Sequence, residues 1–337
     1  FRQFDVGQQM DVLAVERDCR GVAQARQAFS FHSLLVGGNP YSTSSIYTLI
    51  LFLERNWGVF FPRGGTGALV QALVRYFTEM GGEIRCQSEI SQILTAKGKV
   101  TGVRTVQGDV WECDAVVSNG DVVHTYRDLL GKEPMAAKKS KELQHKDFSM
   151  SLFLIYFGTK KKYPNLAHHN VLFGPRYKGL LQDIFQKHKL AEDFSLYLHR
   201  PTATDPSLAP EGCDTFYALS PVPHLDSGTD WASFAETYRA AIAEALEASV
   251  LPGLRDSIVT SKVSTPQDFH DRLWSYKGAG FGLEPLLLQS AWFRPHNRSE
   301  DIPGLYMVGA GTHPGAGVPG VLMSAKALET VVPHVSV

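Results

Sequence analysis

Residues 304–326 read Gly-Leu-Tyr-Met-Val-Gly-Ala-Gly-Thr-His-Pro-Gly-Ala-Gly-Val-Pro-Gly-Val-Leu-Met-Ser-Ala-Lys. Residues 305–308 form a short apolar run, which predicts a buried strand, and the glycines that follow permit backbone conformations closed to larger residues. Pro319 suits the first turn of a helix, where its missing N–H is not needed, and apolar residues recur behind it at helical spacing. The stretch therefore predicts a strand, a glycine loop and a helix.

The start of this predicted helix is a candidate binding site. Its first turn offers unpaired N–H groups and partial positive charge, which favour an anion or an electron-rich ring. Residues 315–320 also satisfy G-x-G-x-x-G, but no strand directly precedes them and too little chain follows for a βαβ unit. We do not interpret these glycines as a Rossmann fingerprint, and a glycine turn that only permits tight packing is the alternative.

The same run resembles the C-terminal signature of the bacterial-type phytoene desaturases, a family within the flavin-containing amine oxidase superfamily. That signature has an apolar strand, Gly-Ala-Gly-Thr-His-Pro-Gly, a small residue, Gly, an aliphatic residue and a later small residue. Its places are held here by Gly309 to Gly315, Ala316, Gly317, Val318 and Ser324. The resemblance continues through residues 29–40, 61–67, 118–128 and 289–298, and so covers nearly the whole chain.

Composition limits the classes of protein that the sequence can represent. Its 337 residues are 44% hydrophobic, enough for a substantial core and two or three domains. Because 33 basic residues balance 34 acidic ones, there is no electrostatic reason to expect nucleic acid. The four cysteines are far apart and predict neither a zinc site nor a disulfide framework, which suits a reducing cytoplasm. The longest apolar run, residues 49–53, is far shorter than the ~20 residues that span a bilayer.

The chain opens at Phe1 without an initiator methionine. In the family that it resembles, an N-terminal strand, a glycine fingerprint and a ribose-binding acid come first. We therefore expect an α/β, two-dinucleotide-binding flavoprotein fold that lacks its N-terminal Rossmann strand-loop-helix. Such a fragment would bind flavin poorly on its own.

Four segments are expected along the chain. Residues 1–57 predict a helical segment that faces substrate or membrane, with one helix over 10–35 and a second after the capping serines at 42–45. The apolar face of the second helix, Ile46 to Leu53, suits ordinary core packing or a lipid contact. His32 is interpreted as a packed helix histidine rather than a catalytic one.

Residues 58–130 predict part of an FAD-binding domain. We expect a small-residue loop at 63–67, a helix over 69–77, a strand over 83–86, a hairpin of 100–106 with 110–113, and a strand over 115–117. Asp121 is placed to cap the next helix. Alternating strands and helices indicate an α/β domain.

We expect residues 131–284 to form a substrate-binding domain. Residues 285–337 are expected to form the C-terminal part of the FAD-binding domain. Strands are expected at 152–157, 170–173, 194–199, 215–219 and 258–263, with a helix over 231–249, as a mixed sheet with covering helices. His168-His169 has no helical ligand spacing and no nearby carboxylate or thiolate pair, so no metal is predicted.

The resemblance implies which residues contact FAD. A first group lies near the cofactor, with the backbone of Ile90 toward adenine: Arg63, Gly64, Gly65, Ile90, Ser118 and Asn119. The loop then holds the ribityl and pyrophosphate side through Gly309, Ala310, Gly311 and Thr312, and the helix start faces the ring through Gly317, Val318 and Pro319. Without the resemblance, the same positions suit a helix entry, a core isoleucine and a strand end.

The resemblance also implies a reaction, which is desaturation of 15-cis-phytoene and partly desaturated carotenes to lycopene. No side chain is an adequate hydride acceptor, so a cofactor is required. A substrate this apolar resides in the bilayer, so a cytoplasmic protein bound peripherally to the membrane surface is expected, with quinone or oxygen as terminal oxidant. His124, Arg127 and Asp128 lie nearest to recognised motifs, yet none is assigned as a general base.

Three other functions are compatible with the same residues. Two are enzymatic, a flavin-dependent carotenoid isomerase and a desaturase for a C30 dehydrosqualene-type substrate, and the absorption spectrum of the products would separate them. The third is a prenyl-lipid escort protein, which shares the fold without using flavin. The intact Gly-Ala-Gly-Thr-His-Pro-Gly loop favours flavin.

Overall fold

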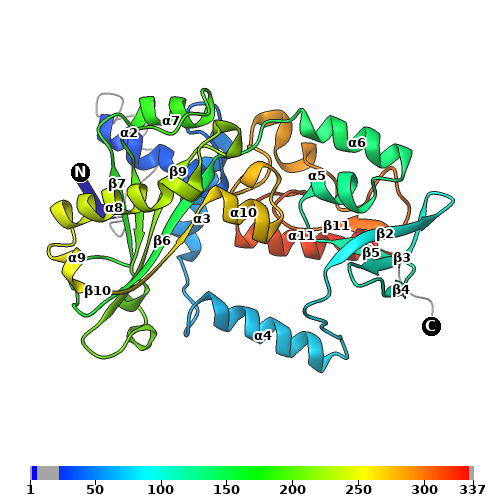
Figure 1. The fold of residues 1–337 in the computed structure, drawn as a ribbon, viewed down its shortest axis with the longest axis horizontal. Coiled ribbons are helices and arrows are strands. Elements are labelled where there is room, and N and C mark those ends of the chain that lie inside the picture. Colours follow the sequence, from blue (N-terminus) through cyan, green and yellow to red (C-terminus); the bar gives the residue numbers. More distant parts are fainter. Residues whose placement is uncertain (1, 6–22, 334–337) are drawn as a thin grey trace. The chain divides into compact units, whose positions relative to one another are not determined.

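The computed structural model describes residues 2–5 and 23–333 (Figure 1). The chain divides into two units, each built from segments that are far apart in the sequence. Unit 1 comprises Phe1–Phe31, Thr48–Ile84 and Ser151–Gln267. Unit 2 comprises His32–Tyr47, Arg85–Met150 and Asp268–Val337.

Unit 1 is built on a six-stranded sheet whose strand order is β1-β7-β8-β9-β6-β10. Its strands are β1 (Arg2–Asp5), β6 (Ser151–Thr159), β7 (His169–Phe173), β8 (Leu196–His199), β9 (Asp214–Val222) and β10 (Ile258–Ser264). Its α-helices are α2 (Ala23–Ser30), α3 (Leu49–Trp57), α4 (Thr66–Glu79), α7 (Tyr177–Phe185), α8 (Trp231–Ser249) and α9 (Leu254–Ser257). The predicted helix over 231–249 and the five predicted strands of this region are confirmed.

One face of this sheet forms the core of unit 1. Because successive side chains point to opposite faces, Phe153, Ile155 and Phe157 of β6 share a face and pack in one cluster with Phe216 of β9. The helix α8 adds apolar residues, including Ile242, to the same cluster. All five ladders of the sheet are antiparallel. The predicted mixed sheet is therefore wrong for this region, and the parallel pair of the described residues belongs to a separate sheet in unit 2.

Unit 2 contains two small sheets. An antiparallel ribbon consists of β2 (Ile90–Ala96), β3 (Lys99–Thr105) and β4 (Val110–Glu112), and a parallel pair consists of β5 (Val116–Ser118) and β11 (Leu305–Met307). Its helices are α5 (Val122–His124), α6 (Pro134–Gln144) and α11 (Val318–Val331), and α10 (Pro266–Leu273) begins in unit 1 and ends in unit 2. The predicted hairpin, the strand at 115–117 and the capping role of Asp121 are confirmed, since the Asp121 carboxylate accepts from Val123 N–H at 2.8 Å.

Two predicted elements differ from the structure. Residues 83–86 form no strand, because they pair with no strand among the described residues, whereas the next apolar positions do pair, as β2 against β3. The predicted helix over 10–35 lies in part outside the described residues, and from residue 23 it consists of α2 followed by a 3₁₀ helix over Phe31–Val36.

The two units follow a different division from the four predicted segments. Residues 131–150 belong to unit 2 rather than to the sheet, because Ala136 and Leu143 of α6 pack in the same core cluster as Leu305 and Met307 of β11. Residues 48–84 belong to unit 1. Periodicity reveals elements but not which core each element joins, so the sequence could not supply this interleaving.

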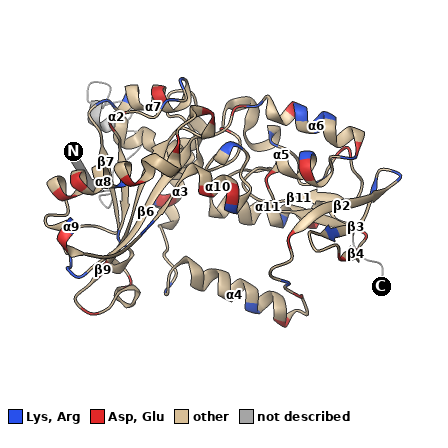
Figure 2. Cartoon of the chain, viewed as in Figure 1, with Lys and Arg blue, Asp and Glu red and all other residues tan. Residues whose placement is uncertain are grey.

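The distribution of charged residues in the structure agrees with the balanced composition of the sequence. Figure 2 shows Lys and Arg interspersed with Asp and Glu, not gathered on one element. Among the described residues, no helix combines the length and the apolarity that crossing a membrane requires. Cys86, Cys113 and Cys213 are free thiols, and Cys19 lies outside the described residues.

Candidate functional site

The glycine loop of unit 2 is positioned by the parallel pair β5–β11. The register aligns Met307 with Ser118, and Val308 N–H donates to the Ser118 carbonyl at 3.0 Å. Parallel strands end at the same edge of a sheet, and the loops that leave this edge form the usual ligand site of α/β folds. The segment Ser118–Asn119 therefore lies beside Gly309, so these three predicted cofactor residues are close together.

Glycine is required at 309 by two independent features. Its φ of +101° lies in a region that side chains disfavour, and a Cβ placed there would stand 2.3 Å from Asn119 Oδ1. Gly311 is also close to a neighbour, since its Cβ would lie 3.2 Å from a methyl group of Val122. The loop backbone therefore packs directly on the turn that follows β5.

Buried hydrogen bonds hold the loop in this conformation. Ser324 of α11 accepts from Gly309 N–H at 2.8 Å, and Thr312 Oγ1 donates to the Gly309 carbonyl at 3.0 Å. The Asn297 side-chain amide donates to the carbonyls of Met307 and His313 at 3.1 and 3.0 Å. Thr312 and Ser324 are fully buried, so the small residue of the sequence signature acts as a hydrogen-bonding clamp.

The helix that follows the loop starts without a side-chain cap. Gly317 precedes it with φ +97°, and no side chain bonds its first N–H groups, although Val318 and Pro319 open the helix as predicted. In its first turn, a Cβ on Gly320 would lie 2.6 Å from the Gly315 carbonyl oxygen, so the loop folds tightly onto the helix. The positive end of α11 is therefore directed at the space beside the loop.

The expected apolar stripe of α11 is only partly buried. Leu322 is 50% exposed, whereas Val321 and Leu328 are half-buried. Ser324 is the only fully buried side chain among the described residues of this helix, and it bonds the loop at Gly309.

Arg294 is a site residue that the sequence reasoning missed. Its side chain is 2% exposed, and it donates from Nη1 to the Ala310 carbonyl at 2.7 Å and from Nη2 to the Leu283 carbonyl at 2.8 Å. Its Nε is buried without a hydrogen-bond partner among the described residues and lies 3.2 Å from the position of a Cβ on Gly315. Burial lowers its pKa. The loop therefore encloses a cation that forms no ion pair with a carboxylate of the described residues.

A cavity of about 540 Å³ in unit 2 brings three predicted residues together. Ile90, Ser118 and Asn119 line it, together with Leu129 and Trp274. Its volume is in the range of small-molecule sites. Arg63, Gly64 and Gly65 belong to unit 1, where Gly64 N–H donates to Asp205 at 2.7 Å, and their role at the cofactor stays a prediction.

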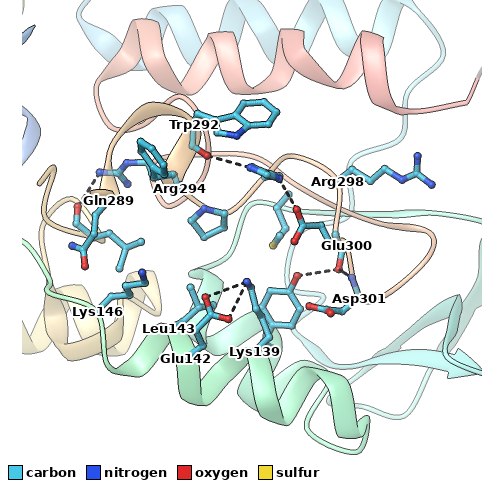
Figure 3. Close-up of a pocket in the computed structure, with 17 residues that line it drawn as sticks. Lys139, Glu142, Leu143, Lys146, Gln289, Trp292, Arg294, Arg298, Glu300 and Asp301 are labelled. Atoms are coloured by element: carbon cyan, nitrogen blue, oxygen red, sulfur yellow. Dashed lines mark hydrogen bonds and ion pairs between the residues drawn. The ribbon is translucent and has the colours of Figure 1, made fainter. Parts of the chain in front are cut away.

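A second pocket, of about 280 Å³, lies between α6 and residues 289–301 (Figure 3). Arg294 borders it, and its rim carries ion pairs of Lys139 with Glu142 and of His296 with Glu300. These pairs give the pocket both signs of charge, and none of the predicted cofactor residues lines it. We do not assign the cofactor to this pocket.

His124, Arg127 and Asp128 form one cluster on a short helical turn. Arg127 Nε donates to Asp128 at 2.8 Å, and Nδ1 of His124 also contacts the Asp128 carboxylate. The bond from Arg127 lowers the pKa of Asp128, which keeps this carboxylate ionised and occupied. That arrangement suits a structural ion pair, and none of the three residues is assigned as a general base.

Glu284 of unit 2 is a buried carboxyl group that directly follows Leu283, whose carbonyl accepts from Arg294. It is 7% exposed, accepts from Ser42 Oγ at 3.2 Å, and burial raises its pKa to about 7. In the unfolded chain the pKa of this carboxyl group is near its ordinary value of 4.5. Below that pH both states are protonated; between the two values only the unfolded state ionises, so stability falls as the pH rises, and above about 7 the loss is complete.

Glu284→Gln is expected to remove this pH dependence. The shift corresponds to about 3 kcal/mol, because each pKa unit is worth about 1.4 kcal/mol. Urea unfolding at pH 4.5 and pH 8 should show the variant gaining stability over wild type only at the higher pH. Glu329→Gln, at an exposed position of α11, is the matched control. Equal stability of wild type and Glu284→Gln at pH 8 would contradict the prediction.

Comparison with known proteins agrees with this geometry. A family model described as flavin containing amine oxidoreductase matches residues 12–327. The chain is 55% identical over 307 residues to a phytoene desaturase (lycopene-forming) from Pseudescherichia vulneris, covering 91% of this chain and 62% of that protein. It is 49% identical over 313 residues to a phytoene desaturase (neurosporene-forming) from Cereibacter sphaeroides, covering 91% and 60%.

A solved structure shares the fold. The crystal structure of an oxidoreductase from Methanosarcina mazei superposes with a TM-score of 0.65 at 17% identity, covering 96% of this chain and 69% of that one. The predicted α/β class is confirmed. The chain spans about three fifths of the length of the two desaturases that it matches. Because the family model covers β5, β11, the glycine loop and the start of α11, the chain belongs to the flavin-containing amine oxidoreductase family.

Proposed function

We propose that this protein is an FAD-dependent phytoene desaturase that converts 15-cis-phytoene to lycopene by successive hydride removals. The observation that carries the proposal is the glycine loop, which is held against Asn119, encloses the Arg294 cation and leads into an uncapped helix. The similarity to proteins named phytoene desaturase supplies the substrate class.

The residues of unit 2 suit FAD in two ways. The cavity lined by Ile90, Ser118 and Asn119 would accommodate part of a dinucleotide, with the Ile90 backbone toward adenine. The backbone of residues 309–312 would hold the ribityl and pyrophosphate side, where glycines allow a close approach. For Arg63, Gly64 and Gly65, which belong to unit 1, a role in cofactor binding rests on the family resemblance alone.

The start of α11 and Arg294 stabilise negative charge in this site. When bound, FAD would supply the hydride acceptor and would become more negatively charged on reduction. Residues 317–319 would hold its ring at the positive end of a 14-residue helix, which favours negative charge. Arg294 adds a full charge in a water-poor environment, where electrostatic interactions are stronger than in water.

The chain's own part in the reaction is orientation and exclusion of water. No dedicated base is assigned, since Asp128 is engaged by Arg127 and His124. An apolar channel beside the flavin orients the polyene, and holding the reacting groups in place supplies part of the rate enhancement.

Contact with a membrane surface is part of the proposal. In unit 1, apolar side chains on and after α3 are exposed: Leu49 by 50%, Phe52 by 55%, Trp57 by 67% and Phe60 by 86%. Exposed apolar groups of this density suit a lipid contact, from which a bilayer-dissolved substrate can enter. Partly desaturated carotenes are the intermediates, and quinone or oxygen is the terminal oxidant.

The test uses the complete protein with FAD and vesicles that contain phytoene. Each desaturation lengthens the conjugated system, so the absorption of the extracted products should move stepwise to longer wavelength and end at lycopene. A product spectrum that ends at neurosporene would show that the protein performs fewer desaturation steps than lycopene formation requires. In the same assay the protein should sediment with the vesicles.

Gly317→Val is expected to abolish reduction of the flavin by phytoene. Its φ of +97° is strained for valine, so the start of α11 must shift. Anaerobic bleaching of the flavin absorption measures the effect. Normal bleaching in the variant would refute the assignment of the helix start, whereas a wild-type protein that releases no flavin on denaturation would favour the escort function.

A further inference from the structure

We propose that His168, His169 and His199 of unit 1 bind a divalent transition-metal ion, with zinc as the best match. We call these three residues the trihistidine cluster. The proposal goes beyond the desaturase function, which gives these residues no task. It also departs from the sequence-based expectation of no metal, because His199 is distant in sequence and only the fold brings it to the pair.

The sheet of unit 1 creates the cluster. His169 of β7 stands directly opposite His199 of β8 in the antiparallel register, so both side chains share a face. His168 precedes β7, and its carbonyl accepts from Arg200 N–H at 2.8 Å, which fixes the backbone beside His199. The ring centroid of His168 lies 4.4 Å from that of His169 and 4.6 Å from that of His199.

Ring nitrogens of the three residues lie within metal-binding reach of one another. One nitrogen from each lies within 4.8 Å of the others. Zinc bonded to three nitrogens at ~2.1 Å in a tetrahedral arrangement places them about 3.4 Å apart. Rotation of the partly buried side chains would have to close this difference when the ion binds.

Hydroxyl groups orient two of the rings for coordination. His168 Nδ1 is 2.5 Å from Thr204 Oγ1, and His169 Nδ1 is 2.6 Å from the Tyr197 hydroxyl. When each Nδ1–H donates to its hydroxyl oxygen, the Nε2 lone pair is left for a metal, as is usual for metal-binding histidines. Nε2 of His168 is buried without a hydrogen-bond partner among the described residues.

Tyr197 serves a second ring as well. Its hydroxyl lies 3.3 Å from His199 Nδ1. Burial raises the pKa of Tyr197, so its hydroxyl stays protonated. A hydroxyl oxygen carries two lone pairs, which can accept from the Nδ1–H groups of His169 and His199.

The donor set indicates the metal. Three imidazoles without a thiolate suit zinc and its neighbours in the first transition series, and they leave a fourth position open. Phe61 packs against His168 edge-on at 4.8 Å, and Tyr217 stacks on His199 at 4.6 Å, so aromatic rings border the cluster. An uncoordinated stack of neutral rings is the alternative that the experiment must exclude.

The test measures metal binding directly on the complete protein. After treatment with a chelator, the protein is dialysed against Zn²⁺ and its zinc content is determined by mass spectrometry. Co²⁺ is then used as a spectroscopic probe, because cobalt bound by three imidazoles in a tetrahedral site absorbs strongly in the visible region. We expect one equivalent of either ion, and a higher melting temperature with zinc present.

His169→Asn and His199→Asn are expected to lose the bound ion, the cobalt spectrum and the zinc-dependent rise in melting temperature. His145→Asn, at an exposed position of unit 2, is the matched control and should keep all three. Circular dichroism verifies that each variant is folded. The proposal is overturned if the folded wild-type protein binds no more metal than His199→Asn, or if both cluster variants keep the cobalt spectrum.

Discussion

Gly309→Val is expected to abolish FAD binding by the complete protein. The valine Cβ would stand 2.3 Å from Asn119 Oδ1, and a φ of +101° is strained for a β-branched residue. Strain of this kind costs about 1–3 kcal/mol before the steric overlap is counted. Because ~1.4 kcal/mol is a tenfold change in affinity, the affinity for FAD should fall at least about tenfold. The flavin-to-protein ratio of the purified protein should fall with it.

Gly67→Ala is the matched control for this substitution. Gly67 lies in the first turn of α4, and a Cβ there meets nothing within 4 Å. Alanine favours a helix over glycine, so the control should keep its flavin and its stability. Flavin content is measured from the absorption of the purified protein after denaturation. A Gly309→Val protein that retains stoichiometric flavin would exclude the loop from the cofactor site.

Arg294→Met is expected to reduce both flavin affinity and stability. The substitution removes the donors to the Ala310 and Leu283 carbonyls, and each unsatisfied buried group costs about 1–3 kcal/mol. It also removes the cation beside the glycine loop. Arg294→Lys should have a flavin affinity and a stability between those of wild type and Arg294→Met. Its ammonium group keeps the charge but lacks the planar guanidinium that bridges two carbonyls.

The two effects of Arg294 are separated by measuring urea unfolding and the flavin redox potential together. Loss of charge should lower the potential in Arg294→Met, since the reduced flavin loses stabilisation, and Arg294→Lys should restore much of it. Arg255→Met is the control, because Arg255 forms an exposed pair with Glu247 on unit 1 and surface pairs contribute little. An unchanged potential in Arg294→Met would limit Arg294 to a structural role.

The sequence predicted the local order of the glycine loop well. Strand, loop and helix over 304–326 follow from an apolar run, four glycines and a proline, and all three are present as β11, the loop and α11. Local conformational preferences of glycine and proline are strong enough to be read without tertiary contacts. The same holds for the Asp121 cap and for the five predicted strands of the sheet in unit 1.

Residue roles that depend on distant partners were beyond the sequence. Nothing in the local sequence distinguishes Arg294 from the other arginines, and only folding buries it against the carbonyls of Ala310 and Leu283. His199 likewise has no local signal that joins it to His168 and His169. A buried cation is recognised by its surroundings, and these are set by segments far apart in the chain.

By itself, the sequence determined most of the elements, the α/β class and the family, because each of these rests on short patterns of glycine, proline and apolar periodicity. The tertiary structure alone decided that residues 131–150 pack with β11, that Arg294 lies beneath the loop and that three histidines converge on one face of a sheet. The physical reason is that burial and the pairing of polar groups are collective properties, fixed only when distant segments exclude water together.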